Sequence, residues 1–597
     1  MAEILGIDLG TTKSVGAVWR NGKPEIIKDT EGHTITPSIV ALDPNTGEWV
    51  VGRAARAVAE YHPDSVIYSI KRLMGRRFKD DNVQDDLRDR RVLYHVSESS
   101  GRPDAIEVTL GTRRLTPQEV SAKVLLKIKQ DAEAHLKKAS ASGRHHEITQ
   151  AVITVPAYFN DSQRQATRDA GRIAGLEVLR VLNEPTAACL AFGYQKLAER
   201  RRVVAVYDLG GGTFDVSILE VGQGPFTVRA TNGNTHLGGD DIDWLIVDWA
   251  MDEILGSEKN GLRKDIHARG RLRIAAEQAK VALSSDERAQ LTVPGPLSPA
   301  SDLHDINLEF TRERLDSLTQ QIIERTFIPC RQALQDAQLT TADIKEVLLV
   351  GSQTRMPSIH RAVHKFFDRE PDASVKPEEA VAMGAAVQAA ILAGEATKLR
   401  LANVVPLTLG LNSEGNMEAL IPRNTPVPIK KTKTYSTVQD KQESVEIAVY
   451  QGERPLVKDN VKLASFRLEG IEPALSGEPE IEVTFDVDFD GILHVKGMDK
   501  RTGNKNEITI TKSVRLSDEE ISTMIRNAAE DISTQLHHRL EDNTHPFPDI
   551  LASAVKAALG TAPLANASEK EWSAYLSTLQ GLDRNLRETQ ETRQAEQ

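Results

Sequence analysis

The spacing of apolar residues predicts an α/β region over about the first 395 positions. Short β-branched runs alternate there with helical stretches, as in residues 148–155 followed by residues 161–174, and such alternation is typical of strands connected by helices. The region also contains an internal repeat, because residues 4–12 and residues 203–213 both place an Asp-Leu-Gly turn after an apolar run. Two halves of this kind facing one another would enclose a cleft.

Beyond residue 404 the apolar positions recur with a period of two. Val445, Ile447 and Val449 fall on one side of a predicted strand, and residues 481–489 repeat the pattern before an Asp-Gly turn. Successive side chains of a strand point to opposite faces of its sheet, so this spacing predicts strands with one buried face. We therefore expect an antiparallel β domain in this region.

The last part of the chain is predicted to be helical. A capping box at residues 517–520 opens one helix, Pro546 and Pro548 interrupt the pattern, and residues 568–571 cap a final helix. The polar tail, residues 589–597, is expected to fray.

These changes in pattern divide the chain into four segments. A length of 597 residues exceeds what one hydrophobic core supports, since cores stop growing near about 250–300 residues. The predicted segments are an α/β domain (1–396), a linker (397–405), a β domain (406–513) and a helical domain with a short polar tail (514–597).

Composition and charge narrow the class of protein. Apolar residues make up 40% and charged residues 27% of the chain, and the net charge of -12 disfavours general nucleic-acid binding. No basic leader with an apolar core opens the sequence, and no run approaches the roughly 18 apolar residues that cross a bilayer. The two cysteines, Cys189 and Cys330, lack metal-like spacing and fit a reducing compartment. We expect a cytoplasmic protein without membrane contacts.

The repeated Asp-Leu-Gly turns predict a binding site for a nucleoside triphosphate. Glycines and threonines after a strand let backbone N–H groups and hydroxyls approach phosphate oxygens, and an aspartate at the strand end can hold hydrated Mg²⁺. One such turn alone would more simply be a hairpin, but two copies ending different halves favour a functional site. A Walker loop does not fit, because residues 214–219 continue as a strand rather than a helix.

The chain strongly resembles the actin-like ATPase superfamily and, within it, the DnaK-type seventy-kilodalton heat-shock chaperones, as a divergent bacterial paralogue. The resemblance spans residues 1 to about 540 and rests on the segments 6–12, 70–73, 154–161, 183–188, 207–215 and 235–239. It implies an actin-like α/β ATPase domain with two duplicated lobes, an antiparallel β-sandwich that binds peptide, and a C-terminal α-helical lid. The implied activity is ATP-dependent binding and release of extended hydrophobic segments of unfolded proteins.

The resemblance also assigns roles for ATP hydrolysis to ADP and phosphate, a reaction that depends on positioning and charge stabilisation. Asp8 and Asp208 would hold Mg²⁺ through its water shell, Lys71 would face the γ-phosphate and the attacking water, and Glu184 would orient that water or the metal. ATP or ADP, Mg²⁺ and K⁺ are the implied cofactors. The implied phosphate contacts are Gly10, Thr11, Thr12, Lys13, Gly210, Gly211, Gly212, Thr213, Gly238 and Gly239, with Thr213 also among the catalytic residues.

A helix face is the candidate for adenosine recognition. Glu277, Lys280 and Ser284 are spaced by three and four, which places them on one side of a helix. Spacing alone favours a solvated amphipathic helix, whereas the resemblance implies that this face grips ribose and adenine. The residues implied to complete the pocket are Gly351, Ser352 and Arg355, with the Arg355 guanidinium stacked on the base.

The β domain carries the implied peptide site. Val445 and Ile447 would line its central pocket beside Tyr435 and Ser436 on a neighbouring strand, although alternation alone makes the two apolar residues ordinary packing. The chain departs from DnaK at Glu414, which stands where an apolar residue would arch over the peptide opposite Val438. A carboxylate there could favour clients with basic flanks, or it could simply point to solvent.

The linker is the most informative departure from the family. Relatives have an apolar run that ends in aspartate, whereas residues 399–403 read Leu-Arg-Leu-Ala-Asn. Pro156, Arg164 and Asp215 resemble positions that relay the nucleotide state to the partner domain, and Asn403 replaces the aspartate of that relay. We hypothesise that ATP-to-peptide coupling is weakened or differently tuned.

The implied partners are unfolded polypeptide clients, a J-domain co-chaperone and a nucleotide-exchange factor. The residues that match the J-domain interface of the family are Tyr158, Asn160, Asp161, Arg180 and Asn183. An actin-like small-molecule kinase or a filament-forming ATPase would not need the β domain. A regulatory paralogue that does not refold clients remains the main alternative, since the departures concentrate in coupling.

Overall fold

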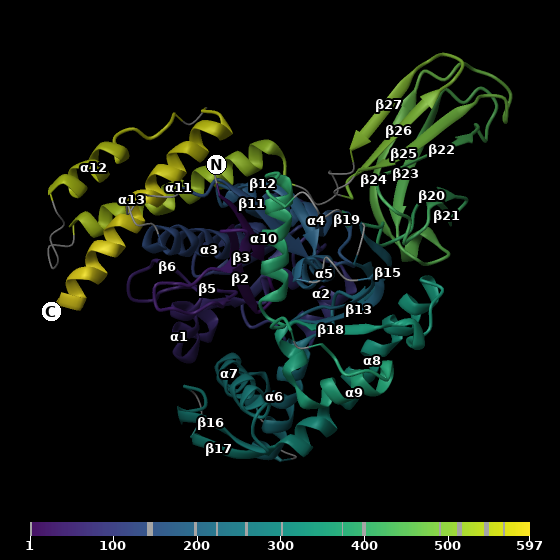
Figure 1. Ribbon diagram of the computed structural model, residues 1–597. Helices are drawn as coiled ribbons and strands as arrows, with labels where there is room; N and C mark the ends of the chain where they lie inside the picture. The colour runs from purple at the N-terminus through teal and green to yellow at the C-terminus, as the bar shows by residue number, and fades with distance from the viewer. Residues whose placement is uncertain are drawn as a thin grey trace.

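The computed structural model has an α/β body with a β-sandwich on one side and helices on the other (Figure 1). It describes residues 3–139, 147–195, 200–222, 225–256, 261–299, 302–372, 374–396, 401–488, 491–509, 516–541, 549–564 and 567–596. The prolines at positions 546 and 548, the first residues of the predicted linker and the predicted boundary near residue 513 lie outside this range.

The first lobe of the body is built on a mixed sheet. Its strand order is β12-β11-β1-β2-β3, with β4 also paired to β2. Successive residues of β2 face opposite layers: a side chain at Gly16 would point at Ile128 of α3, whereas Ala17 packs with Ala382 and Ala386 of α10. The elements of this layer are β1 (Ile4–Asp8), β2 (Lys13–Arg20), β3 (Lys23–Ile26), β4 (Thr36–Pro37), β11 (Gln150–Val155), β12 (Glu177–Asn183), α3 (Pro117–Ala139), α4 (Asp161–Ile173), α5 (Glu184–Gln195) and α10 (Ala380–Leu392).

Smaller elements complete the first lobe at its outer edge. They include two three-stranded sheets, β6-β5-β7, which contacts α1, and β10-β9-β8, together with the helix α2. Their bounds are β5 (Ile39–Leu42), β6 (Trp49–Val51), β7 (Val66–Tyr68), β8 (His95–Glu98), β9 (Ile106–Leu110), β10 (Arg113–Leu115), α1 (Arg53–Tyr61) and α2 (Asp81–Arg88).

The second lobe repeats the central hairpin of the first. Its sheet has the order β18-β13-β14-β15-β19, and β13 pairs with β14 across a short turn just as β1 pairs with β2. The internal repeat predicted from the sequence is therefore confirmed as a repeated strand-turn-strand unit. The elements are β13 (Arg202–Leu209), β14 (Phe214–Val221), β15 (Phe226–Asn234), β16 (Arg288–Pro296), β17 (His304–Thr311), β18 (Glu346–Val350), β19 (Leu401–Ala402), α6 (Gly239–Leu255), α7 (Ile266–Ala282), α8 (Arg312–Asp336) and α9 (Pro357–Phe367).

The β-sandwich consists of two four-stranded antiparallel sheets. The strand orders are β21-β20-β23-β24 and β22-β25-β26-β27, and side chains such as Val449, Val483 and Phe485 form the core. The predicted period-two strands are confirmed, although the strand that begins at Ile481 ends at Val487. The strands are β20 (Leu409–Ser413), β21 (Asn416–Ile421), β22 (Ile429–Tyr435), β23 (Ser444–Gln451), β24 (Val461–Glu469), β25 (Ile481–Val487), β26 (Leu493–Asp499) and β27 (Lys505–Thr509).

The C-terminal helices are α11 (Asp518–Glu541), α12 (Asp549–Leu559) and α13 (Glu569–Glu596). The predicted capping box is present, because the Glu520 carboxylate accepts the Ser517 N–H at 2.6 Å and the Ser517 hydroxyl accepts the Glu520 N–H at 3.1 Å. The prediction of a frayed tail was wrong for residues 589–596, which continue α13. Glu, Gln, Arg and Ala dominate that stretch and are good helix formers, so polarity alone does not end the helix.

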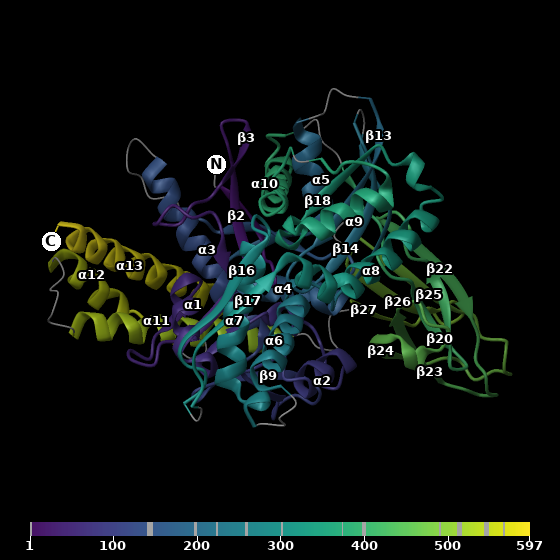
Figure 2. The ribbon, with the colours of Figure 1, turned by 90° about the horizontal axis from the view of Figure 1, so that it is seen from below.

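These helices pack on the first lobe and not on the β-sandwich, which lies on the opposite side of the body (Figures 1 and 2). Ile521, Ile525 and Leu579 belong to the same apolar core as Leu125 and Ile128 of α3. Both cysteines are buried and free. None of the helices in the described ranges combines the length and apolar character that a bilayer crossing requires.

Candidate active site

The two repeated turns meet across a cleft between the lobes. A β-carbon at Gly211 would lie 2.4 Å from the Thr12 hydroxyl, and one at Gly212 would lie 2.7 Å from the Thr11 methyl carbon. The start of α6 joins the second turn, since the Gly239 N–H donates to the Gly210 carbonyl at 3.0 Å. The structure therefore brings together glycines and threonines that the sequence predicted, and a side chain added at Gly211 or Gly212 would fill the space between the turns.

Two aspartates lie at the ends of the corresponding strands, Asp8 as the last residue of β1 and Asp208 as the next-to-last residue of β13. Burial is the main cause that raises the pKa of Asp8 to about 7 and the pKa of Asp208 well above its ordinary value, with Glu184 adding to both shifts. The buried Asp208 Oδ2 has no hydrogen-bond partner among the described residues. Hard divalent cations prefer such oxygen ligands, so this donor set fits Mg²⁺, and the cation would offset the cost of burying the carboxylates.

A buried ion pair faces the aspartates. Lys71 Nζ lies 2.6 Å from Glu184 Oε1, and their side chains are only 4% and 9% exposed. Lys71 belongs to the 3-10 turn Ile70–Arg72, whereas Glu184 begins α5. The tertiary fold thus places a fixed positive charge and a carboxylate in the cleft from segments 113 residues apart.

The turn that carries Lys71 is anchored to the second lobe. Arg72 donates to both carboxylate oxygens of Asp241 at 3.2 and 2.7 Å, and Ser69 donates to Asp240. These aspartates lie in the first turn of α6, where negative charge is favoured. This network was not predicted from the sequence, although two consecutive acidic residues directly after Gly238-Gly239 could have indicated it.

The candidate nucleoside pocket is lined by residues from both lobes. Glu277 and Lys280 of α7 lie there with Ser284, Lys13 and Ser352. Burial would raise the pKa of Glu277, but Arg56, 3.0 Å away, and Lys280 outweigh it and keep that pKa below its usual value. The three predicted residues of the helix face are therefore in one pocket, and their charges are balanced by neighbours that spacing could not reveal.

Arg355 lies outside that pocket. Its guanidinium pairs with Glu378, is about half exposed, and borders a neighbouring hollow that it shares with Ser284 and His360. Gly351 has φ +82° and packs against the Leu209 carbonyl at the end of β13. The structure thus brings Ser352 to the nucleoside pocket and leaves Arg355 at its rim.

Two predicted relay residues hold the loop that follows β11. The Arg164 guanidinium donates to the Phe159 and Ala157 carbonyls at 3.1 and 2.9 Å, and Asp215 accepts the Tyr158 N–H at 3.1 Å. Pro156 opens the same loop. Burial lowers the pKa of Arg164 to about 10, because the charges of Asp161, Asp215 and Glu184 offset the loss of hydration only in part.

Asn403 connects this region to the segment that leads to the β-sandwich. Asn183 Nδ2 donates to Asn403 Oδ1 at 3.3 Å, and Asn183 directly precedes Glu184 of the buried pair. The two residues before Asn403 form β19, which pairs in parallel with β15. Of the predicted J-domain residues, Asn160 caps α4 through Gln163, so it has a structural role in this fold.

The β-sandwich touches the second lobe through a charged contact. Arg423 donates to both carboxylate oxygens of Asp336 at 2.9 Å, and Asn424 donates to the same carboxylate at 3.0 Å. Asp336 is the last residue of α8. This contact was not predicted, because nothing in the local pattern relates the β21–β22 turn to the end of a helix 87 residues earlier.

The predicted peptide-site residues differ in exposure. Ile447 is 5% exposed and its Cδ1 lies where a side chain at Gly497 would be, so it is packed in the sandwich core. Val445 is half-buried, Val438 is 78% exposed, and Glu414 is exposed at the tip of the β20–β21 hairpin. Tyr435 ends β22, and the Ser436 hydroxyl that follows donates to the Pro479 carbonyl at 2.7 Å.

The paired turns, buried carboxylates and clustered glycines are the features of a nucleotide-binding cleft. A family model described as Hsp70 protein matches residues 4–597. The chain belongs to the Hsp70 family. At the level of that family it is an ATP-dependent heat-shock chaperone and an ATPase, and its members bind ATP or ADP with Mg²⁺ and act on unfolded clients with co-chaperones.

Gly10→Ala is expected to weaken ATP binding about tenfold. The added β-carbon would lie 2.0 Å from the Lys13 carbonyl oxygen, and relief of such overlap costs about 1–3 kcal/mol, where about 1.4 kcal/mol is a factor of ten. Titration with a fluorescent ATP analogue measures the affinity. Gly101→Ala is the matched control, because a β-carbon at Gly101 meets nothing within 4 Å; equal affinities in both variants would contradict the assignment of the first turn.

Proposed function

We propose that this chain hydrolyses ATP in the cleft between its lobes and uses the nucleotide state to control binding of extended hydrophobic peptides by its β-sandwich. The observation that carries the proposal is the buried Lys71–Glu184 pair beside Asp8 and Asp208, between two phosphate-binding turns. We further propose the limits 1–396, 397–405, 406–513 and 514–597 for the ATPase domain, linker, peptide-binding domain and lid, and a cytoplasmic location.

Each charged residue of the cleft has its own proposed role in ATP hydrolysis. Mg²⁺, held by Asp8 and Asp208 through water, would neutralise charge on the phosphates when bound. Lys71 provides a fixed positive charge toward the transferred phosphoryl group, and Glu184 orients Lys71 and the attacking water. Because both side chains are already desolvated, their dipoles need little reorganisation during the reaction.

The peptide is proposed to bind as an extended segment at the end of the β-sandwich that carries Glu414 and Val438. Tyr435 ends β22, Ser436 follows it, and Val445 and Ile447 belong to β23. Backbone hydrogen bonds would supply affinity and a shallow apolar pocket would supply broad specificity. Half-burial of Val445 supports a pocket there, whereas the full packing of Ile447 supports a role in its floor.

Coupling would run from Glu184 through Asn183 and Asn403 to the linker strand. The contact between the two asparagines is neutral, and neutral hydrogen bonds are about half as strong as charge-assisted ones. Arg164 borders the same small hollow as Asn403. The absence of a negative charge at position 403 therefore supports a weakened signal, and it favours a regulatory paralogue as the second candidate function.

Asn403→Asp is expected to increase peptide stimulation of ATP hydrolysis about fivefold, within the usual range of coupling between sites. The new carboxylate would accept from Asn183 and face the undercompensated Arg164. Single-turnover hydrolysis with and without an extended apolar peptide measures the effect in both chains. Strong stimulation of the unmodified chain, with no gain in the variant, would contradict the weakened-coupling proposal and leave the ATPase assignment intact.

Co-chaperones complete the proposed cycle. A J-domain protein would bind near Tyr158, Asn160, Asp161, Arg180 and Asn183, and a nucleotide-exchange factor would open the cleft. A refolding assay with such partners separates a full chaperone from a regulatory paralogue. A small-molecule kinase is disfavoured, because it has no need for the β-sandwich.

A further inference from the structure

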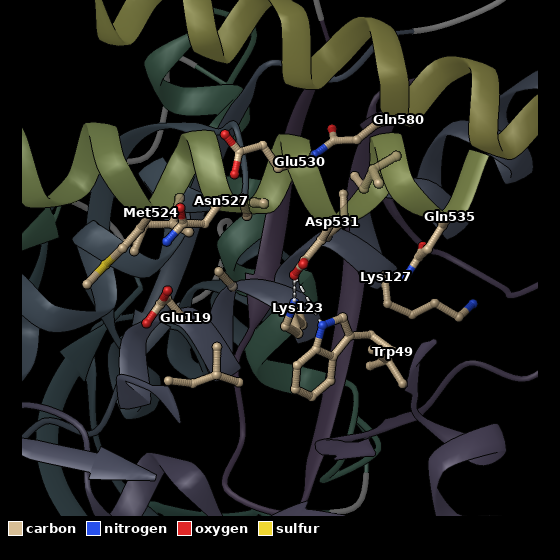
Figure 3. A pocket seen from close by; sticks show the side chains of 18 of the residues that line it. Trp49, Glu119, Lys123, Lys127, Met524, Asn527, Glu530, Asp531, Gln535 and Gln580 are labelled. Atoms are coloured by element: carbon tan, nitrogen blue, oxygen red, sulfur yellow. Dashed lines mark hydrogen bonds and ion pairs between the residues drawn. The ribbon is translucent and has the colours of Figure 1, made fainter. Parts of the chain in front are cut away.

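A cavity of ≈ 520 Å³ lies at the seam between the first lobe and the C-terminal helices. Its walls come from β6, β10 and α3 on one side and from α11 and α13 on the other (Figure 3). This volume falls within the range of about 300–1,000 Å³ that small-molecule sites occupy. Neither the candidate nucleotide cleft nor the β-sandwich contributes a residue to this cavity.

Several of the charges that border the cavity are already paired. Asp531 of α11 lies 3.2 Å from Arg113 and 3.6 Å from Lys123, and it also accepts the Trp49 indole N–H at 3.2 Å (Figure 3). Asp583 of α13 is likewise paired with Arg539 at 2.7 Å. A charged ligand would have to compete with these pairs and would lose solvation on entry.

The lining mixes polar residues such as Asn527 and Gln535 with an apolar part. The apolar part includes the Trp49 ring, Leu115, Leu126, Ile173, Met524 and Ile532. Lys123 Nζ already lies 4.3 Å from the centre of the Trp49 ring, so a flat or aliphatic ligand body would pack against the rest of the indole and the flexible methionine.

One polar atom in the lining lacks a partner. Gln580 of α13 is 4% exposed, and its Oε1 accepts from Lys129 Nζ at 3.3 Å. Among the described residues that line the cavity, its Nε2 is the one buried side-chain atom without a hydrogen-bond partner. A buried donor left unpaired costs free energy, so a ligand that offers an acceptor to this amide would be favoured.

We propose that the seam cavity binds an uncharged amphipathic small molecule, with its apolar body between Trp49 and Met524 and a carbonyl or hydroxyl oxygen accepting from Gln580. The site is composite, because the lobe supplies Trp49 and the C-terminal helices supply Met524 and Gln580. Binding therefore requires the helices to be docked on the lobe.

The ligand would stabilise the docked arrangement, since a molecule that binds only one of two states shifts the population toward that state. In the proposed chaperone cycle, docked helices are not available to cover the β-sandwich. The ligand would thus oppose peptide retention. This consequence rests on the proposed function, whereas binding at the seam does not.

The test uses prodan, 6-propionyl-2-(dimethylamino)naphthalene, an uncharged naphthalene whose emission shifts to the blue in apolar sites and whose ketone is an acceptor. The full-length protein should bind it saturably at one site. Gln580→Met should weaken binding about fivefold by removing the donor. Ala528→Trp and Ala54→Trp, which fill the cavity from its two sides, should each weaken it at least tenfold.

Two controls make the result specific to the seam. Thr523→Trp, on an exposed position of α11 outside the lining, should leave prodan affinity unchanged. An excess of apolar peptide should not displace the probe, which excludes the β-sandwich as its site. Absence of saturable binding, displacement by peptide, or full affinity in both filling variants would overturn the proposal, and none of these readouts depends on ATP hydrolysis.

Discussion

Lys71→Ala is expected to lower the rate of ATP hydrolysis by about 10²- to 10³-fold while the chain stays folded. Loss of one preorganised group that stabilises the transition state has an effect of about this size. The substitution also leaves Glu184 buried without the cation that lies 2.6 Å away, and an uncompensated buried carboxylate tends to become protonated. Single-turnover hydrolysis measures the rate, and titration with nucleotide shows that ATP still binds.

Lys79→Ala is the matched control for this experiment. Lys79 also pairs with a glutamate, but its side chain is 70% exposed and lies outside the cleft. Surface ion pairs contribute little, so hydrolysis should stay at the unmodified rate. A comparable loss in both variants would indicate a general effect of removing a lysine and would contradict the assignment of Lys71 to phosphoryl transfer.

Charge reversal at the contact between the β-sandwich and the second lobe is expected to reduce ATP-triggered peptide release about tenfold or more. Arg423 and Asp336 form a two-point hydrogen-bonded ion pair with side chains 23% and 13% exposed. Hydrogen bonds to charged groups contribute about 1.5–3 kcal/mol, and about 1.4 kcal/mol is a factor of ten. Stopped-flow release of a labelled peptide on addition of ATP measures the effect.

The double variant decides whether the effect comes from this pair. Arg423→Asp and Asp336→Arg should each be defective, and their combination should recover part of the release rate because the two charges can pair again. Arg501→Ala is the matched control, since Arg501 pairs with Glu472 within the β-sandwich and both side chains are more than half exposed. Additive defects in the double variant would show that the pair does not transmit the signal.

The strand-turn-strand repeat could be predicted because it is local. An apolar run, an Asp-Leu-Gly turn and a second apolar run lie within about twenty residues in each copy, and such short-range patterns determine hairpins directly. The same reason explains the success of the capping box at Ser517 and of the alternating strand that starts at Ile481. Their stabilising contacts are made by residues close in sequence.

Contacts between distant segments could not be predicted in this way. Glu277, Lys280 and Ser284, which the spacing groups on one helix face, line one pocket, but no local pattern reveals that Arg355 pairs with Glu378 at its rim. Which group a side chain such as Arg355 contacts depends on how side chains from different elements pack within a few ångströms. Single-sequence patterns carry no information about it.

The position of the C-terminal helices shows the same limit on a larger scale. Their amphipathic pattern predicts that one face is buried, but not whether that face lies on the β-sandwich or on the first lobe. Contacts such as Asp531 with Arg113 and Lys123 place it on the lobe in this structure. The seam cavity exists only because of that placement.

The sequence by itself determined the kinds of element, the repeated Asp-Leu-Gly turns and the apolar periodicity of the β-sandwich, because each depends on residues a few positions apart. Only the tertiary structure decided which charges meet: Lys71 with Glu184, Arg423 with Asp336, and Asp531 with the first lobe. Charge pairs of this kind act over a few ångströms and depend on burial. They therefore become defined only when the fold brings distant segments together and excludes water from between them.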